Sequence, residues 1–440
     1  MQHYDEILIG SGPAAYKMSN LLAKTDHQVL VIEGFEFGGT CPNYGCEPKI
    51  FLEGAVRNVL QSQQLVGKGV SHPANLDWHQ LMQTKLDRFN PWPEETKEII
   101  AQSHTVESGY AEFVDDHTVK VNGNTYQADH IIIATGQTPN ILDIPGKENL
   151  HTSFDVLLLK ELPQRMTFIG AGFVSLELAT LVAAAGAHVT VVVHSDRVLR
   201  EFPQADCDVL VQAMQDRGIQ FKFNTNTKAL VSSADGLVVQ TDQGEIATDY
   251  VVDATGRHPN IARLHLERTG IQYDRHGIQV DDHLMTTVDG VYAIGDVVSR
   301  REPKLTPVAE FEGQYLFDYL TGQMTAPINY PVIGRAAFTY PVVAAAGINP
   351  DDVANDEAYQ VKREPLNYGS LYAGQNDQLS QLTLVFKGEQ LVGVSEVGEH
   401  AADDVNNFLP IIGLKITGPE YRQAIIAIYP ALADKVGGDL

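Results

Sequence analysis

A strand that runs directly into a glycine-rich turn and a helix occurs twice in this 440-residue chain, and this pattern restricts the fold most strongly. The first copy has a strand at Glu6–Ile9, the turn GSGPAA at residues 10–15, a helix over Ala14–Lys24 and a second strand at Val29–Ile32. Such glycines permit a sharp bend and the close approach of a pyrophosphate, which the N–H groups and dipole of the helix N-terminus hold. The sequence therefore predicts an opening βαβ unit that binds a dinucleotide.

The second copy begins with a strand at Met166–Ile169. GAGFVSLE at residues 170–177, a helix to about Ala185 and a strand at Val189–Val193 follow it. Two such units predict two bound dinucleotides, one a flavin and the other a nicotinamide carrier. The units share a motif without forming an array, which excludes a solenoid.

Two of the three cysteines lie in the run GGTCPNYGCEPK at residues 38–49, directly after the first unit. Two thiols held near a bound redox cofactor can accept electrons as a pair and cycle between disulfide and dithiol. The alternatives are a pair of buried structural cysteines or half of a metal site, but the sequence offers no further Cys or His ligands at short spacing nearby. We therefore expect a redox-active pair and no metal.

Composition narrows the class further. The length suggests about three domains, and no segment approaches the run of about 18 apolar residues that a membrane span needs. The chain enters the apolar strand Ile7–Ile9 without a signal-like leader. Three cysteines fit a reducing compartment, and a formal net charge of −25 argues against nucleic acid or anionic membranes as partners. We expect a cytoplasmic enzyme.

The rest of the chain mixes helices and strands. Polar surface helices are expected between Trp78 and His104, broken by NPWP at residues 90–93. Further strands are predicted at Tyr110–Val114, Thr118–Val121, His130–Ala134, Tyr250–Ala254 and Tyr292–Ile294. After about Pro327 the pattern, for example at Thr383–Phe386 and Leu391–Val394, indicates a separate α+β domain.

These elements, in this order, resemble the class I pyridine nucleotide–disulfide oxidoreductases, the two-cysteine group that includes glutathione reductase, dihydrolipoamide dehydrogenase and mercuric reductase. GGTCPNYGCEPK matches the group's G-G-T-C-x-N-x-G-C-x-P-K, and LTPVA at residues 305–309 adds to the match. The resemblance covers essentially the whole chain. It implies an α/β fold with two Rossmann-like dinucleotide-binding domains and a C-terminal α+β dimerisation domain. The expected bounds are 1–145 and 257–326 for a discontinuous FAD domain, 146–256 for an NAD(P)H domain and 327–440 for the interface domain.

The resemblance also implies which residues bind the cofactors. FAD would contact Gly10, Gly12, Pro13, Ala14, Glu33, Gly39, Thr40, Lys49, Thr135, Gly136, Gly295, Asp296, Thr306, Pro307 and Val308. NADPH would contact Gly170, Gly172, Phe173, Val174, Glu177, His194, Ser195, Arg197, Arg200, Thr255, Gly256 and Arg257. Lys49 would lie near the flavin ring and pair with Glu177, because a cation there stabilises the anionic reduced flavin.

By the same resemblance, hydride passes from the nicotinamide to the flavin, and the reduced flavin breaks a Cys41–Cys46 disulfide. Cys46 would be the flavin-side thiol, and Cys41 the interchange thiol that attacks the substrate. A helix beginning near Pro48 would favour the thiolate through its N-terminal dipole.

The loop after Val193 bears on the choice of nicotinamide. An acidic residue at this strand end would bind the ribose 2′-hydroxyl and repel a 2′-phosphate, and Val193 is not acidic. His194 and Arg200 align with the two arginines that hold this phosphate in glutathione reductase, and a guanidinium suits phosphate geometrically. The loop therefore predicts NADPH. Arg197 is either a further phosphate ligand or a surface residue.

The C-terminal segment departs from the family pattern. Where the family has a His-Pro pair and then a Glu, this chain has Tyr429-Pro430 and then Asp434. The family's histidine acts as acid and base in the other subunit's disulfide site, whereas a phenol, with a reference pKa of about 10, only donates a proton near neutrality. We expect base catalysis to be weaker by about 100-fold unless the substrate has a better leaving group. The alternative is that Tyr429 is only an interface aromatic.

The substrate side departs as well. The arginines by which glutathione reductases bind the carboxylates of the peptide are replaced by Asn20, Leu21 and Gln314. We therefore expect a homodimeric, FAD-containing, NADPH-dependent reductase of a small disulfide other than glutathione disulfide. Two alternatives keep the flavin: reduction of a non-disulfide acceptor such as a metal ion, quinone or oxygen, and a low-turnover flavoprotein that senses redox state.

Overall fold

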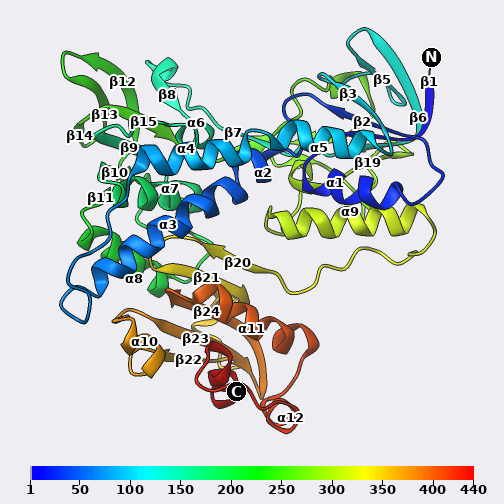
Figure 1. Cartoon of the computed structure of the whole chain (residues 1–440). Coiled ribbons are helices and arrows are strands. Elements are labelled where there is room, and N and C mark those ends of the chain that lie inside the picture. The colour runs from blue at the N-terminus through cyan, green and yellow to red at the C-terminus, as the bar shows by residue number, and fades with distance from the viewer. Residues whose placement is uncertain (1) are drawn as a thin grey trace. The chain divides into compact units, whose positions relative to one another are not determined.

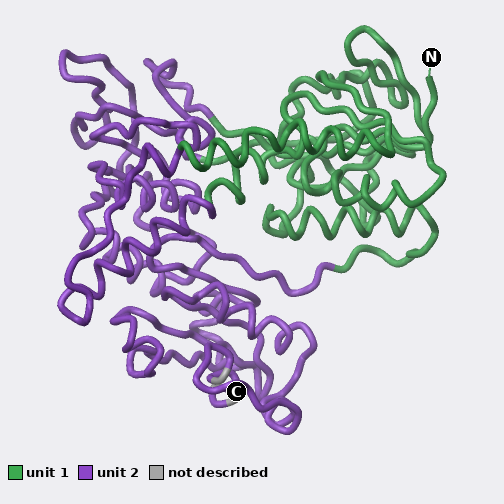
Figure 2. Tube along the Cα trace, in the orientation of Figure 1, with its two compact units in different colours: residues 1–49, 83–140, 256–329 green, residues 50–82, 141–255, 330–440 purple. Residues whose placement is uncertain are grey.

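The computed structural model describes residues 2–440, without the side chains of residues 434, 437 and 439. The chain forms two compact units (Figure 2). Unit 1 comprises residues 1–49, 83–140 and 256–329, and unit 2 comprises residues 50–82, 141–255 and 330–440. Both units combine sheets with helices, so the predicted α/β class is confirmed. The predicted division into three domains stays a prediction.

Unit 1 is built on a seven-stranded sheet in the order β3-β2-β1-β6-β5-β4, with β19 paired to β6. The parallel strands are β1 (Gln2–Ile9), β2 (Val29–Glu33), β3 (Thr105–Ser108), β6 (Asn124–Ile133) and β19 (Val291–Ala293), and the antiparallel ones are β4 (Glu112–Asp115) and β5 (Thr118–Val121). Helices α1 (Pro13–Leu22), α2 (Thr40–Tyr44), α5 (Trp92–Ala101) and α9 (Thr306–Leu320) belong to this unit. Figure 1 shows α1 and α9 side by side along the sheet.

The central strand of unit 1 is buried on both faces. Ile7 and Ile9 pack into one apolar cluster, and Leu8, which points to the opposite face, packs into a second cluster together with α1 and α9. A strand covered on both sides needs a continuous apolar run instead of alternation, which explains the sequence of β1.

Unit 2 contains a five-stranded parallel sheet, a three-stranded antiparallel sheet and a five-stranded antiparallel sheet. The parallel sheet has the order β11 (Gln220–Lys222), β10 (His188–Val192), β9 (Arg165–Ile169), β15 (Tyr250–Asp253), β8 (Leu150–His151). Helices α7 (Phe173–Ala184) and α8 (Gln204–Asp216) accompany it, and β12 (Thr227–Ser233), β13 (Gly236–Thr241) and β14 (Gly244–Thr248) form the small sheet. The last sheet has the order β20 (Gly334–Ala337), β21 (Val342–Gly347), β24 (Gln390–Gly398), β23 (Gln381–Lys387), β22 (Gln360–Pro365).

The remaining elements are short or connect the units along the chain. Helices α3 (Cys46–Gln64) and α4 (Trp78–Phe89) each begin in one unit and end in the other. Unit 1 also has β7 (Gln137–Pro139), β16 (Arg257–Pro259), β17 (Tyr273–Asp274) and β18 (Gly277–Ile278). Unit 2 also has α6 (Ser153–Val156), α10 (Ser370–Gly374), α11 (Ala401–Leu414), α12 (Gly418–Ala424) and α13 (Val436–Asp439).

Both predicted βαβ units are present, with shifts at their ends. Helix α1 ends at Leu22 instead of Lys24, and the helix expected near Pro48 begins at Cys46. The polar helices between Trp78 and His104 are α4 and α5, and the break between them is shorter than predicted, because α5 already begins at Trp92. The antiparallel strands β12–β14 were not among the predicted elements.

The first glycine of each glycine-rich turn allows two backbones to meet. Gly10 has φ +114°, and a Cβ atom there would lie 2.3 Å from the carbonyl oxygen of Ala134. Gly170 has φ +107°, and a Cβ atom there would lie 2.4 Å from the carbonyl oxygen of Ala254. Only glycine tolerates this conformation and this contact, so both strand–turn–helix units require it at the same place.

Candidate functional site

The two cysteines of the GGTCPNYGCEPK run face each other in unit 1. Cys41 lies in α2 and Cys46 is the first residue of α3. Both are free thiols and form a hydrogen bond with each other. The Sγ atom of Cys46 lies 3.5 Å from Oγ1 of Thr306, the first residue of α9. The arrangement is a dithiol with a hydroxyl group beside it.

The surroundings make the two thiols chemically unequal. The hydrogen bond with Cys46 and burial raise the pKa of Cys41, while a hydrogen bond with Thr306 acts in the opposite direction. Cys46 occupies the positive N-terminal end of α3, where a thiolate is favoured. These surroundings make Cys41 hard to ionise, whereas the helix start favours ionisation at Cys46.

Arg257 adds a positive charge to this region. Its guanidinium donates hydrogen bonds to Oγ1 of Thr40 (3.3 Å) and to the carbonyl oxygen of Gln137 (2.5 Å). Burial lowers the pKa of Arg257, and the nearby charges of Asp296 and Cys46 counteract this effect. The family resemblance assigned Arg257 to the nicotinamide, but its hydrogen-bond partners Thr40 and Gln137 belong to unit 1, and Thr40 is one of the residues expected to bind FAD.

A buried ion pair holds the turn that carries Asp296. Arg300 and Glu312 are 5% and 0% exposed, and their charged atoms lie 2.5 Å apart. Glu312 accepts a hydrogen bond from the backbone N–H of Gly295 (2.6 Å), and Arg300 donates one to the Gly295 carbonyl (2.8 Å). The pair therefore fixes both polar groups of Gly295. Sequence reasoning missed Arg300 and Glu312, because no motif links the two positions.

The carboxylate of Asp296 accepts no hydrogen bond from the described residues. Burial raises its pKa, and the nearby cations Arg300, Arg257 and Lys304 counteract this effect. Thr135 likewise has a buried hydroxyl without a described partner. Buried polar groups are normally hydrogen-bonded, so Asp296 and Thr135 suit a polar ligand such as the ribityl chain expected at this place.

The glycine-rich turn of unit 1 forms a narrow cradle. A Cβ atom at Gly39, which has φ +70°, would lie 2.7 Å from the Cα atom of Gly12. Glu33 follows at the end of β2 and accepts hydrogen bonds from the N–H (3.0 Å) and hydroxyl (2.7 Å) of Ser11 and from the N–H of Phe35 (2.9 Å). Burial raises the pKa of Glu33. Bare backbone with an acidic residue at the next strand end is the arrangement that an adenosine pyrophosphate requires, so the residues present fit FAD.

All residues predicted to bind FAD belong to unit 1. They are Gly10, Gly12, Pro13, Ala14, Glu33, Gly39, Thr40, Lys49, Thr135, Gly136, Gly295, Asp296, Thr306, Pro307 and Val308. Their individual contacts to the cofactor stay predictions. Lys49 is in unit 1 and Glu177 is in unit 2, so their pairing also stays a prediction. Within unit 2, Glu177 is buried and accepts a hydrogen bond from the N–H of Phe338 (2.7 Å).

The expected nicotinamide residues lie at the carboxyl ends of the parallel strands in unit 2. Gly170, Gly172, Phe173 and Val174 form the turn after β9 and the start of α7. Thr255 donates from its N–H (3.0 Å) and its hydroxyl (2.7 Å) to the carboxylate of Asp253 at the end of β15. Two of the expected residues, Gly256 and Arg257, instead belong to unit 1.

The structure separates the two candidate arginines of the phosphate loop. The guanidinium of Arg200 lies 3.3 Å from Nε2 of His194, so these two side chains adjoin, and their contact to NADPH stays a prediction. Arg197 instead donates to the carbonyl of Phe202 (2.7 Å) and lies 3.8 Å from the carboxylate of Asp351. Ser195 donates its hydroxyl to the carbonyl of Arg197 (3.1 Å). These contacts favour a structural role for Arg197.

Tyr429 lies in the segment of residues 425–431, which we call the Tyr429 loop and which has no helix or strand. Its side chain is 82% exposed, and the neighbouring Ile426 and Ile428 are also highly exposed. The loop is bounded by α12 and by a short 3₁₀ helix, Leu432–Lys435. The side chain of Asp434, predicted to accompany Tyr429, lies outside the described side chains.

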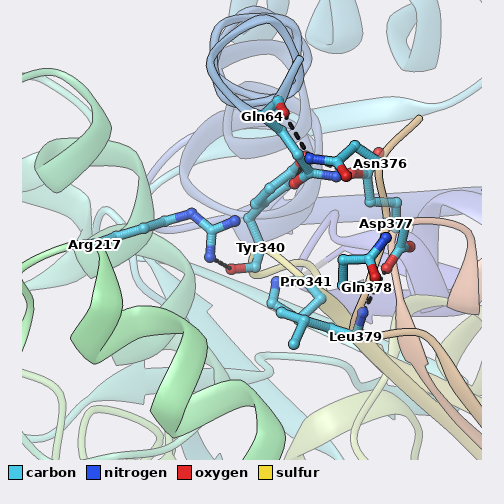
Figure 3. A pocket seen from close by; sticks show the side chains of 9 residues that line it. Gln64, Arg217, Tyr340, Pro341, Asn376, Asp377, Gln378 and Leu379 are labelled. Carbon is cyan, nitrogen blue, oxygen red and sulfur yellow. Dashed lines mark hydrogen bonds between the residues drawn. The ribbon is translucent and has the colours of Figure 1, made fainter. Parts of the chain in front are cut away.

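Unit 2 also contains a small cavity of about 150 Å³ (Figure 3). Its walls are Gln64, Arg217, Tyr340, Pro341, Asn376, Asp377, Gln378, Leu379 and Glu399. Asn376 donates to the carbonyl of Gln64 (2.9 Å), and Arg217 donates to the carbonyl of Tyr340 (3.4 Å). These bonds tie the end of α3 and the end of α8 to neighbouring loops. None of the residues predicted from the sequence to be catalytic or to bind a cofactor lines this cavity.

Within the described part of the chain, no helix is long and apolar enough to cross a membrane. Among the same residues, no group of three or more His, Cys, Asp or Glu side chains is arranged to hold a metal ion.

A dithiol next to a dinucleotide cradle, with a second glycine-rich unit, defines a flavin- and nicotinamide-dependent oxidoreductase, and comparisons identify its family. The family model for pyridine nucleotide–disulphide oxidoreductases matches residues 4–313. Mercuric reductase from Bacillus cereus is 29% identical, covering 98% of this chain and 70% of the relative. Glutathione reductase from Burkholderia cepacia is 29% identical, covering 99% and 98%. The HOCl-induced flavoprotein disulfide reductase RclA from Escherichia coli has the same fold, with a TM-score of 0.90 at 24% identity and 99% coverage of both chains.

The chain belongs to the pyridine nucleotide–disulphide oxidoreductase family and to its class I. It is therefore an enzyme that uses FAD and a pyridine nucleotide.

The buried ion pair generates the first prediction. Arg300→Met leaves Glu312 charged and buried without its partner, which costs about 3–5 kcal/mol. We expect a thermal unfolding temperature lowered by several degrees and faster release of FAD on dilution, measured by flavin fluorescence. The neighbouring Arg301 is exposed, so Arg301→Met is a matched control and leaves both measurements unchanged. Equal unfolding temperatures and equal rates of FAD release in the two variants would contradict this role of the Arg300–Glu312 pair.

The unequal thiols generate the second prediction. Because the pKa of Cys41 is raised, its alkylation by iodoacetamide in the reduced enzyme increases with pH beyond the point where an ordinary thiol, of pKa about 8.5, levels off. Cys46→Ala removes the first cause of the shift and moves the profile to lower pH. Thr306→Val removes the opposing hydrogen bond and moves it to higher pH. Mass spectrometry of the modified peptide measures each rate, and a single unchanged profile in all three proteins rules out this electrostatic account.

Proposed function

We propose that the protein is an NADPH-dependent reductase of a small disulfide other than glutathione disulfide, working through a Cys41–Cys46 disulfide. The hydrogen-bonded thiol pair beside Thr306 is the observation that carries the proposal. Bound FAD supplies the two-electron chemistry that links the nicotinamide to this pair. We also propose two Rossmann-like domains, which the parallel sheets of both units support.

The chain's own residues divide the work at the thiols. Cys41 passes its proton to its hydrogen-bond partner Cys46 and, as the thiolate, attacks one sulfur of the substrate disulfide. This step forms a mixed disulfide and releases the first thiolate. Cys46 then attacks Cys41, which releases the second thiolate and restores the Cys41–Cys46 disulfide. The substrate gains two electrons and two protons, and the dithiol loses them. Placement of the more readily ionised thiol at the start of α3 suits Cys46 for the second attack.

Proton delivery is the proposed task of Tyr429. A departing alkyl thiolate is basic and leaves faster when a donor protonates it. We propose that Tyr429 donates this proton in the disulfide site of a second copy of the chain. The exposed Ile426, Ile428 and Tyr429 side chains support such a homodimer, because exposed apolar side chains that are grouped, unlike scattered ones, mark protein–protein contacts. The low cysteine count supports the expected cytoplasmic location.

A second candidate is reduction of a non-disulfide acceptor, namely a metal ion, quinone or oxygen. Tyr429 in place of an imidazole favours it, because such acceptors release no thiolate that needs a proton. The similarity to mercuric reductases at 29% identity also supports it. Both candidates share the relay from the nicotinamide to the thiols and differ only in the last step.

Stopped-flow reduction by NADPH, followed by mixing with acceptors, tests the proposed relay. We expect a long-wavelength absorbance band from a Cys46 thiolate next to oxidised FAD, and its loss in Cys46→Ser. Small disulfides should then reoxidise the enzyme faster than glutathione disulfide does. A reduced enzyme without this band contradicts the relay. Reoxidation by metal ions or quinones alone selects the second candidate.

The phosphate loop generates a separate prediction. Arg200→Met raises the KM for NADPH about tenfold, the value of one charge-assisted phosphate contact, and leaves the KM for NADH unchanged. Arg197→Met is the matched control, because Arg197 is held by Phe202 and Asp351, and it leaves both KM values nearly unchanged. Higher kcat/KM with NADH than with NADPH in the wild type contradicts the assignment.

A further inference from the structure

Four polar side chains contact one another beside the C-terminal sheet of unit 2. Glu396 comes from β24, Asp404 from the first turn of α11, Tyr372 from α10 and Lys435 from the 3₁₀ helix that follows the Tyr429 loop. Figure 1 shows α10, α11 and the end of the chain gathered around these strands. Both carboxylates are fully buried, and the Lys435 side chain is 13% exposed. We call this group the Lys435 cluster.

The ammonium group of Lys435 is the centre of the cluster. It is bonded to Asp404 and lies 3.2 Å from Oε2 of Glu396 and 2.6 Å from the hydroxyl of Tyr372. Tyr372 in turn donates to Asp404 (2.8 Å). Burial and the neighbouring Asp404 carboxylate raise the pKa of Glu396, and Lys435 counteracts this effect. Lys435 is the cation that contacts both buried carboxylates.

A buried carboxylate without a cation is very unfavourable. Detachment of the chain around Lys435 would leave the buried carboxylates of Glu396 and Asp404 without this cation, so the ion pairs favour the attached position. Apolar contacts reinforce this attachment: Val436 is 1% exposed, and Leu432 and Leu440 pack against the same core. On the other side of the Tyr429 loop, α12 is also anchored, since a Cβ atom at Gly418 would lie 2.3 Å from the carbonyl oxygen of Leu440.

The Tyr429 loop is thus an exposed segment between two fixed ends. Ile426 and Tyr429 project from it, whereas Lys435, which follows after a single short helix, is held from three elements. Loss of the Lys435 contacts would free the whole downstream end and widen the range of positions available to Tyr429. A proton donor must lie within hydrogen-bond reach of the atom that it protonates, so this freedom lowers the rate of proton transfer.

We propose that Lys435 is a positioning residue, which by its ion pairs with Asp404 and Glu396 fixes the Tyr429 loop so that Tyr429 protonates the leaving thiolate in the disulfide site of a second copy of the chain. The proposal rests on the proposed role of Tyr429. Lys435 itself touches neither the substrate nor the cofactor. It acts only through the backbone between residues 429 and 435.

Two disulfides separate proton delivery from general damage to the protein. Cystine releases a basic alkyl thiolate that needs a proton, whereas dithiobis(nitrobenzoate) releases a weakly basic aryl thiolate that leaves without one. In the FAD-containing enzyme we expect Tyr429→Phe and Lys435→Met each to slow reoxidation by cystine about tenfold or more. Neither variant should change the rate with dithiobis(nitrobenzoate) or the rate of reduction by NADPH. Lys415, exposed at the end of α11, gives the matched control Lys415→Met, which leaves all rates unchanged.

The double variant and hydrogen exchange complete the test. If Lys435 acts through Tyr429, Lys435→Met adds no further loss to Tyr429→Phe. Lys435→Met should also increase amide exchange in residues 432–440 while α11 keeps its protection, and Lys435→Arg, which retains the charge, should restore both protection and rate. If cystine reoxidises Tyr429→Phe slowly but reoxidises Lys435→Met at the wild-type rate, the positioning role is overturned and the proposed function stays intact. If cystine reoxidises Tyr429→Phe at the wild-type rate, the proposed role of Tyr429 itself is overturned. Additive losses, or equal losses with both disulfides, overturn the coupling between the two residues.

Discussion

The close approach of backbone at Gly10 and Gly170 is the constraint on which the rest of the molecule depends. In each unit the first glycine of the turn sits against the carbonyl of an Ala-Thr-Gly segment that lies far along the chain. This contact sets where the next helix begins and therefore where its N-terminal N–H groups point. The dinucleotide cradles, the position of the thiols after the first cradle and the phosphate loop after the second all follow from it.

The charges and hydrogen bonds around the residues expected near the flavin differ from those around the residues expected near the substrate. Asp296, Arg257 and Arg300 lie close together, and the cations counteract the effect of burial on the acid. The thiols differ because one begins a long helix and the other is half-buried and hydrogen-bonded to it. On the substrate side, an exposed phenol stands where the family has an imidazole. We therefore propose that the electron supply retains the family's parts and that the proton supply does not.

The sequence was most informative where function requires particular residues in a short run. The glycine-rich turns, the thiol pair and the apolar strand β1 could all be predicted, because each depends on neighbours in the chain. The Arg300–Glu312 pair and the Lys435 cluster could not, since their members come from separate elements and no local pattern joins them. The same limit applies to Arg197 and Arg200, which look alike in the sequence. Only the contact of Arg197 with Phe202 and Asp351 distinguishes them.

Helix α9 has a consequence for how such an enzyme can change over evolution. It begins at Thr306, beside the thiols, and contains Glu312, which holds Gly295 next to Asp296. Because one rigid helix serves both places, a substitution that shifts it alters the dithiol and the flavin cradle together. Selection for a new acceptor is thereby directed away from α9 and toward segments that can vary independently, of which the exposed loop bearing Tyr429 is an example.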